Sequence, residues 1–133
     1  MRILLVCYGN ICRSPVAAAM LRALHPDWEV RSAGISPEIN RPVHPPMARA
    51  AAAEGIELGP AFSRSVAADD LASYDRIVAL DGAVLEALRE RPGGERAEAF
   101  AEATGLGRDV PDPYYSGDFA GTLAVLREGL PKL

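Results

Sequence analysis

Short apolar runs alternate along the chain with longer stretches in which apolar residues recur every three or four positions. The first run, Ile3 to Val6, is rich in branched side chains, as buried parallel strands are. Further strands are predicted over 28–32 and 76–80, and by a weaker pattern over 98–100. Strands that alternate with helical patterns are typical of an α/β doubly wound fold. We therefore predict one sheet of four parallel strands, with helices on both faces.

Helices are predicted after each of the first three strands and at the end of the chain. The first begins at Ser14-Pro15, because serine is a favoured N-cap and proline a favoured first helical residue. Asp118 is the expected cap of the last helix, and helices over 45–54 and 82–91 end near glycines. The segments 35–46 and 105–117 are predicted to be long loops. The apolar positions that mark the last helix are Phe119, Leu123, Leu126 and Leu130.

Length and composition favour a single domain over 1–133. With 133 residues, 49% of them hydrophobic, the chain can build one core of ordinary size. Its net charge of −4 argues against a broad nucleic-acid surface, and neither a signal peptide nor a membrane span is predicted. Only two cysteines occur, both in one loop, which predicts no disulfide framework and suits a reducing compartment. We expect a cytoplasmic protein that binds neither nucleic acid nor membrane.

The segment between the first strand and the first helix carries the candidate chemistry. Residues 7–14 read CYGNICRS, with a cysteine and an arginine six positions apart. Gly9 and Asn10 tolerate the left-handed backbone that a tight loop needs, and a helix start presents N–H groups to an anion. The planar Arg13 guanidinium can hold two phosphoryl oxygens, and these surroundings favour ionisation of the Cys7 thiol. The pattern predicts a phosphate site with a nucleophile at its base.

A candidate general acid follows far downstream, in the segment VPDPYY at 110–115. Asp112 lies between two prolines, and Pro113 restricts its backbone to extended geometry, which helps to aim the carboxylate. A group that protonates the leaving oxygen is what the phosphate loop lacks. An aspartate beside a proline can also simply cap a turn.

Together these motifs resemble the low-molecular-weight protein tyrosine phosphatase family. The resemblance covers nearly all of the chain and rests on CYGNICRSP at 7–15, SAG at 32–34, the strand at 75–80 and DPYY at 112–115. It implies that Cys7 attacks phosphorus to give a cysteinyl-phosphate, that Arg13 binds the phosphoryl oxygens, and that Asp112 acts as acid and then as base. The implied substrates are phosphotyrosine-containing proteins or small aryl phosphates, with inorganic phosphate as product. No metal or cofactor is expected. We expect the protein to be a monomer.

The resemblance also assigns supporting roles in the loop. It implies that Ser14 hydrogen-bonds the thiolate, and that Asn10 holds the loop in shape, partly through Ser32. Cys12 matches a second cysteine that forms a reversible disulfide with the nucleophile in the family, although packing alone would also explain a cysteine there. The residues expected to bind phosphate or substrate are Tyr8, Gly9, Asn10, Ile11, Cys12, Ser14 and Tyr114.

The chain departs from the family pattern at two places. The loop at 35–42, ISPEINRP, lacks the aromatic residue that stacks on the substrate ring in the family. Position 8, commonly leucine, is Tyr8, and our hypothesis is that Tyr8 and Tyr114 replace the missing ring. A histidine that supports the loop asparagine is also absent after Gly55-Ile56, so that loop support is expected from Ser32 alone.

Three other functions share this loop chemistry. Arsenate reduction in the family needs further cysteines downstream, and none follows Cys12, so an external thiol would be required. A catalytically silent phosphopeptide-binding module would be expected to lack the acid or the nucleophile, and a phosphocysteine carrier would transfer rather than hydrolyse. Outside the loop, Asp69 and Asp70 are expected only to cap a helix and face solvent.

Overall fold

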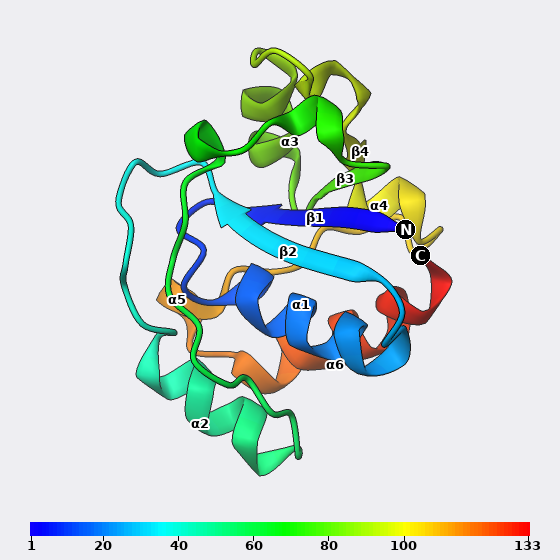
Figure 1. Ribbon diagram of the computed structural model, residues 1–133. Coiled ribbons are helices and arrows are strands. Elements are labelled where there is room, and N and C mark those ends of the chain that lie inside the picture. The colour runs from blue at the N-terminus through cyan, green and yellow to red at the C-terminus, as the bar shows by residue number, and fades with distance from the viewer.

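The computed structural model describes all residues, 1–133, and contains the predicted four-stranded parallel sheet (Figure 1). The strands are β1 (Arg2–Cys7), β2 (Glu29–Gly34), β3 (Arg76–Ala79) and β4 (Glu98–Ala99), in the spatial order β2-β1-β3-β4. The prediction for the fourth strand was one residue too long, because Phe100 begins a helix and its ring is fully buried. The central strand β1 is buried along almost its whole length, as its continuous apolar run predicts.

Helices cover both faces of the sheet, as predicted. On one face lie α1 (Arg13–Leu24), α2 (Pro45–Ala53) and α6 (Phe119–Gly129), and on the other lies α3 (Gly82–Arg89) (Figure 1). Short helices α4 (Phe100–Ala103) and α5 (Pro113–Ser116) follow β4 and precede α6. Single 3-10 turns complete the chain at Val66–Ala68, Leu71–Ser73, Gly94–Arg96 and Leu130–Lys132.

Side chains of β1 alternate between two hydrophobic cores, one on each face of the sheet. Ile3, Leu5 and Cys7 belong to the core that includes residues of α1 and α6. Leu4 and Val6 belong to the second core, with residues of α3. Because side chains of a strand alternate between its two faces, Cys7, the last residue of β1, lies on the same face as α1.

The predicted start of the first helix, with Ser14 as N-cap and Pro15 as first helical residue, was two residues too late. The helix begins at Arg13 with Cys12 in the N-cap position, and no side chain caps its first N–H groups. The Ser14 hydroxyl is unavailable as a cap because it bonds Asn10 and contacts the Cys7 sulfur. Asp118 is the N-cap of α6, as predicted, and accepts a bond from Gly121 N at 2.9 Å.

The predicted long loop at 105–117 contains the four-residue helix α5. Asp112 is its N-cap and Pro113 its first residue, and the Asp112 carboxylate accepts a bond from Tyr114 N at 3.0 Å. This capping bond fixes one carboxylate oxygen and leaves the other to point elsewhere.

Gly34 ends β2 directly against the loop that follows β1. A Cβ at Gly34 would lie 2.7 Å from the carbonyl oxygen of Tyr8 and 3.0 Å from the carbonyl carbon of Gly9. Two backbone bonds, from Ile35 N to Cys7 O and from Ser36 N to Tyr8 O, continue the contact beyond the strand. The close approach of two backbones therefore requires glycine at this position.

None of the helices has the length and hydropathy needed to span a bilayer.

We expect the substitution Gly129→Ala to destabilise the fold without touching the loop after β1. A Cβ at Gly129 would lie 2.3 Å from Cζ of the buried Phe100 ring, so the helix and the ring would have to separate. Overpacking of this kind costs about 1–3 kcal/mol. Denaturant unfolding measures the loss, with Ala124→Ser on the exposed face of α6 as the control. An unfolding midpoint equal to that of the control would contradict the contact.

Candidate active site

The loop from Cys7 to Cys12 curls around the Cys7 sulfur. Asn10 N donates a hydrogen bond to Cys7 Sγ at 3.2 Å, and the Ser14 hydroxyl oxygen lies 3.0 Å from the same sulfur. Asn10 has a φ of 55°, the left-handed backbone expected of it. The uncapped N-terminus of α1 faces the loop, so that its N–H groups and partial positive charge remain available to an anion.

Asn10 makes three side-chain hydrogen bonds that hold the loop in place. Its Nδ2 donates to Ser14 Oγ at 2.7 Å and to Ser32 Oγ at 3.0 Å, and the second of these partners is the one that the family resemblance implied. Its Oδ1 accepts from the backbone N of Arg64 at 2.8 Å. The prediction that Ser32 alone supports the loop was therefore wrong. Arg64 reaches Asn10 because its own carbonyl accepts from Gly34 N, which seats this segment beside the end of β2.

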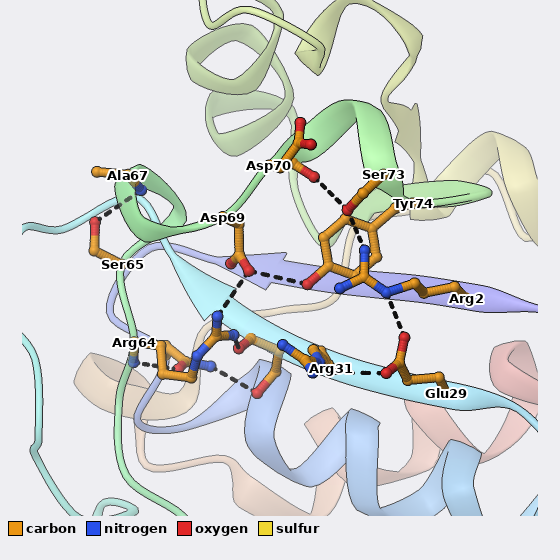
Figure 2. A network of polar contacts seen from close by, with 12 residues as sticks. Arg2, Glu29, Arg31, Arg64, Ser65, Ala67, Asp69, Asp70, Ser73 and Tyr74 are labelled. Carbon is orange, nitrogen blue, oxygen red and sulfur yellow. Dashed lines mark hydrogen bonds and ion pairs between the residues drawn. The ribbon is translucent and has the colours of Figure 1, made fainter.

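The Arg64 side chain is anchored by a polar network on the outer side of β2 (Figure 2). Arg64 donates to the Ser32 carbonyl at 3.0 Å and to Asp69 Oδ1 at 2.7 Å, and the Tyr74 hydroxyl donates to the same oxygen at 3.0 Å. The Asp69 side chain is only 5% exposed. The expectation that Asp69 caps a helix or faces solvent was wrong, because its carboxylate is buried and accepts from both Arg64 and Tyr74.

Arg2 closes the far end of this network. Its guanidinium lies 4.1 Å from the centroid of the Tyr74 ring and also bonds Glu29 and Ser73 (Figure 2). Burial and the bond to Asp69 raise the pKa of Tyr74, so its hydroxyl keeps the proton that it donates. Loop residue Asn10 is thus connected through Arg64 and Asp69 to the edge of the sheet.

Arg13 is buried, and three acceptors on two segments hold its guanidinium. Nη1 donates to Asp81 Oδ2 at 2.8 Å and to the Val110 carbonyl at 3.1 Å, while Nη2 lies 3.6 Å from Asp112 Oδ2. Burial disfavours its charge, but Cys7, the bond to Asp81 and the charge of Asp112 outweigh burial and raise the pKa of Arg13. The fork is therefore both charged and fixed in direction.

Sequence reasoning missed Asp81. It directly follows the predicted third strand, and its other oxygen caps α3 by accepting from Val84 N at 2.8 Å. An acidic residue at the carboxyl end of a strand, in the sheet edge where ligands bind, is a signal that could have found it. Its role as the partner of Arg13 needed the tertiary structure.

A cavity of about 380 Å³ joins the loop to the segment around Asp112. Cys7, Arg13 and Asp112 all line it, so the structure brings the three predicted catalytic residues together. Asn10 and Ser14, predicted to bind phosphate, do not line it and lie behind the loop as supports. The other lining residues are Tyr8, Gly9, Ile11, Cys12, Ser36, Glu38, Arg41, Tyr114 and Tyr115.

Tyrosine rings supply the aromatic walls of this cavity. Tyr8 is 61% exposed and Tyr114 is 45% exposed, so both present ring surface to the solvent side. His44 lies 4.9 Å from the Tyr114 ring and Tyr115 stands edge-on at 5.1 Å, which supports Tyr114 from two sides. The loop at 35–42 contributes a charged pair instead of a ring, with Arg41 3.2 Å from Glu38.

Cys12 differs chemically from the other loop cysteine. Burial raises the pKa of the Cys12 thiol to about 12, and the nearby Cys7 and Asp112 act in the same direction. Cys12 is therefore a protonated thiol at neutral pH. Both cysteines are free, and no three histidine, cysteine or acidic side chains group together as a metal site would require.

Comparisons with known proteins agree with this geometry. The model of the low molecular weight phosphotyrosine protein phosphatase family matches residues 2–133. The protein-tyrosine-phosphatase YfkJ of Bacillus subtilis is 34% identical, with 98% of this chain and 92% of the relative covered. Its crystal structure superposes with a TM-score of 0.89, at 31% identity, over 99% of this chain and 91% of that one.

Two further solved structures share the fold. Wzb of Vibrio vulnificus, in complex with benzylphosphonate, has a TM-score of 0.88 at 28% identity, over 98% of this chain and 94% of that chain. The arginine phosphatase YwlE, with a phosphorylated serine in its active site, has a TM-score of 0.83 at 25% identity, over 100% of this chain and 95% of that chain. The chain described here therefore belongs to the low-molecular-weight phosphotyrosine protein phosphatase family.

Proposed function

We propose that this protein hydrolyses phosphotyrosine monoesters, with Cys7 as nucleophile, Arg13 as phosphate ligand and Asp112 as general acid and base. The observation that carries the proposal is the one cavity that Cys7, the fixed Arg13 fork and Asp112 line together, with Asp112 Oδ2 facing Arg13. These are the groups that in-line displacement at phosphorus and protonation of a leaving oxygen require.

In the first step Cys7 Sγ attacks phosphorus, forming an S–P bond as the P–O bond to the phenol breaks. Asp112 gives its proton to the departing oxygen. Arg13 and the N–H groups at the start of α1 hold the remaining phosphoryl oxygens, on which charge spreads in the transition state. The bond from Asn10 N and the contact with Ser14 hold the Cys7 sulfur in place at the base of the loop.

In the second step Asp112, now a carboxylate, takes a proton from water as the water oxygen attacks phosphorus. The S–P bond breaks, inorganic phosphate leaves and the Cys7 thiolate is restored. Arg13 Nη2 lies 3.6 Å from Asp112 Oδ2, so the group that binds the phosphoryl oxygens also positions the acid and base. No cofactor enters either step.

Two of the solved relatives support this assignment. In the YwlE structure the phosphorylated group is a serine that replaces an active-site cysteine, as expected of a covalent phosphoryl intermediate at that position. Benzylphosphonate, the ligand of Vibrio vulnificus Wzb, is an aryl-bearing phosphate analogue. Because YwlE is described as an arginine phosphatase, phosphoarginine is the appropriate comparison substrate for this chain.

We further propose that the protein acts in the cytoplasm as a monomer, on phosphotyrosine in proteins. Both cysteines are buried thiols in one loop, which suits a reducing compartment. The proposal that Cys12 forms a disulfide with Cys7 under oxidation follows from their place in the same core. The protonated state of Cys12 makes Cys7 the thiol that an oxidant would meet first.

We expect Cys7→Ser to lower turnover of p-nitrophenyl phosphate by about 10³-fold or more, in reducing, metal-free buffer.

Asp112→Asn should lower kcat by about 10²-fold or more for phenyl phosphate. The loss should be smaller for p-nitrophenyl phosphate, because its leaving group needs a proton less. The same enzyme preparations are also assayed with phosphoarginine and with phosphotyrosine peptides, and the two turnover rates are compared. Equal effects of Asp112→Asn on both aryl esters would contradict the acid role, and no turnover by the intact protein would overturn the proposal.

Tyr8→Leu tests whether Tyr8 replaces the missing ring. We expect KM for aryl phosphates to rise about two- to tenfold, the worth of one aromatic contact, with kcat little changed. Inhibition by inorganic phosphate should stay the same because the phosphate ligands are intact. Phe62→Leu, which removes another exposed ring outside this cavity, is the control. A KM equal to that of the control would count against the hypothesis.

In the Cys7→Ser variant, the remaining thiol of Cys12 should resist iodoacetamide. Burial, the largest cause of its raised pKa, persists when Cys7 is replaced, so the thiolate fraction of Cys12 at pH 8 stays well below that of an ordinary cysteine. Mass spectrometry should find it unlabelled in the folded protein and labelled quickly in guanidinium.

The same shift predicts how stability depends on pH. The unfolded thiol ionises near pH 9, whereas the folded thiol keeps its proton up to about 12, so the unfolded state binds fewer protons between these values. Stability should therefore fall as pH rises above 9, and Cys12→Ala should flatten this slope. Equal slopes in the two proteins would show that Cys12 does not contribute.

A further inference from the structure

A second polar hollow lies on the outer edge of β2, apart from the catalytic cavity. Its volume is about 320 Å³, and its lining residues come from α1, from β2 and from the segment 60–64. Three of them are the arginines Arg22, Arg31 and Arg64, and none is acidic. No residue lines both hollows. In a chain with a net charge of −4, this is a local concentration of positive charge.

The positive charge of this hollow is only partly compensated. Arg64 pairs with Asp69 at 2.7 Å, and Arg31 lies 3.5 Å from Glu29 (Figure 2). Arg22 has no carboxylate within 4.0 Å, and its Nε and Nη2 both donate to the Val30 carbonyl. Partial desolvation lowers the pKa of Arg22, the effect expected of a cation without a counter-charge.

We propose that this hollow binds a phosphate group, held by the guanidinium groups of Arg22, Arg31 and Arg64. Guanidinium forks match the tetrahedral oxygens of phosphate and form charge-assisted hydrogen bonds with them. The dianion supplies the counter-charge that Arg22 lacks. Phe62, 59% exposed, gives the hollow an apolar wall on which the body of an organic phosphate can pack.

The hollow shares two of its residues with the supports of the catalytic loop. Ser32 Oγ accepts from Asn10 Nδ2, and the backbone N of Arg64 donates to Asn10 Oδ1. A phosphate that restrains Ser32 and Arg64 therefore restrains both outer partners of Asn10. Binding in the hollow therefore restrains the loop that holds Cys7, although the bound phosphate does not contact the substrate.

The test is an NMR titration of the intact protein with inorganic phosphate, after one equivalent of orthovanadate has filled the catalytic cavity. Vanadium NMR verifies that vanadate stays bound. We expect saturable shifts of the Nε–Hε signals of Arg22, Arg31 and Arg64, and of the Asn10 side-chain amide, over the millimolar range. O-phosphoserine in a parallel titration shows whether a phosphorylated residue binds more tightly than free phosphate, with the Phe62 ring shifting as well.

Arg22→Gln and Arg31→Gln should each weaken phosphate binding about tenfold, the effect of losing one charge-assisted hydrogen bond. Arg49→Gln is the matched control, since it removes the same charge from an exposed position on α2 that lines neither hollow. Should Arg22→Gln fail to fold, Arg31→Gln decides alone, because Arg31 makes only one distant ion pair. Shifts that do not saturate, that persist unchanged in both variants, or that follow the loss of vanadate would overturn the proposal.

Discussion

The site depends on the three hydrogen bonds that hold the Asn10 side chain. A loop whose backbone N–H groups converge on an anion cannot pair those groups with its own carbonyls, so its shape has to be imposed by side chains. Asn10 does this from a left-handed backbone position, by reaching Ser14 on α1, Ser32 on β2 and the backbone of Arg64. The side-chain amide of Asn10 thereby forms hydrogen bonds with α1, with β2 and with the segment that carries Arg64.

The second constraint is electrostatic. Arg13 is buried, and a buried guanidinium is tolerated only when acceptors surround it. Asp81 and the Val110 carbonyl satisfy one nitrogen, which leaves the other side of the fork toward Asp112 and the cavity. Because Asp81 also caps α3, the direction of the fork is linked to the position of a helix on the opposite face of the sheet.

Local patterns were sufficient to predict the strands, most helix boundaries and the phosphate loop, because the geometry of a strand, loop and helix in succession depends on residues that are adjacent in the chain. Asp112 could be found for the same reason, since Pro113 restricts it directly. The pairing of Asp81 with Arg13 and of Arg64 with Asn10 joins positions far apart in the chain, and no local pattern predicts such pairs. Ser14 shows a different failure: its preference for the cap position is outweighed by the side-chain bond with Asn10, four residues earlier in the chain.

The two edges of the sheet are unequal, and both are poor templates for another chain. β4 has only two residues, so it offers almost no row of open N–H and C=O groups. At the other edge, the end of β2 is covered by the segment that carries Arg64, through the bond from Gly34 N and the bridge between Gly34 and Ser65. The segment that holds Asn10 thus also covers the end of β2 against strand addition, so its displacement would open that end to intermolecular β-pairing and aggregation.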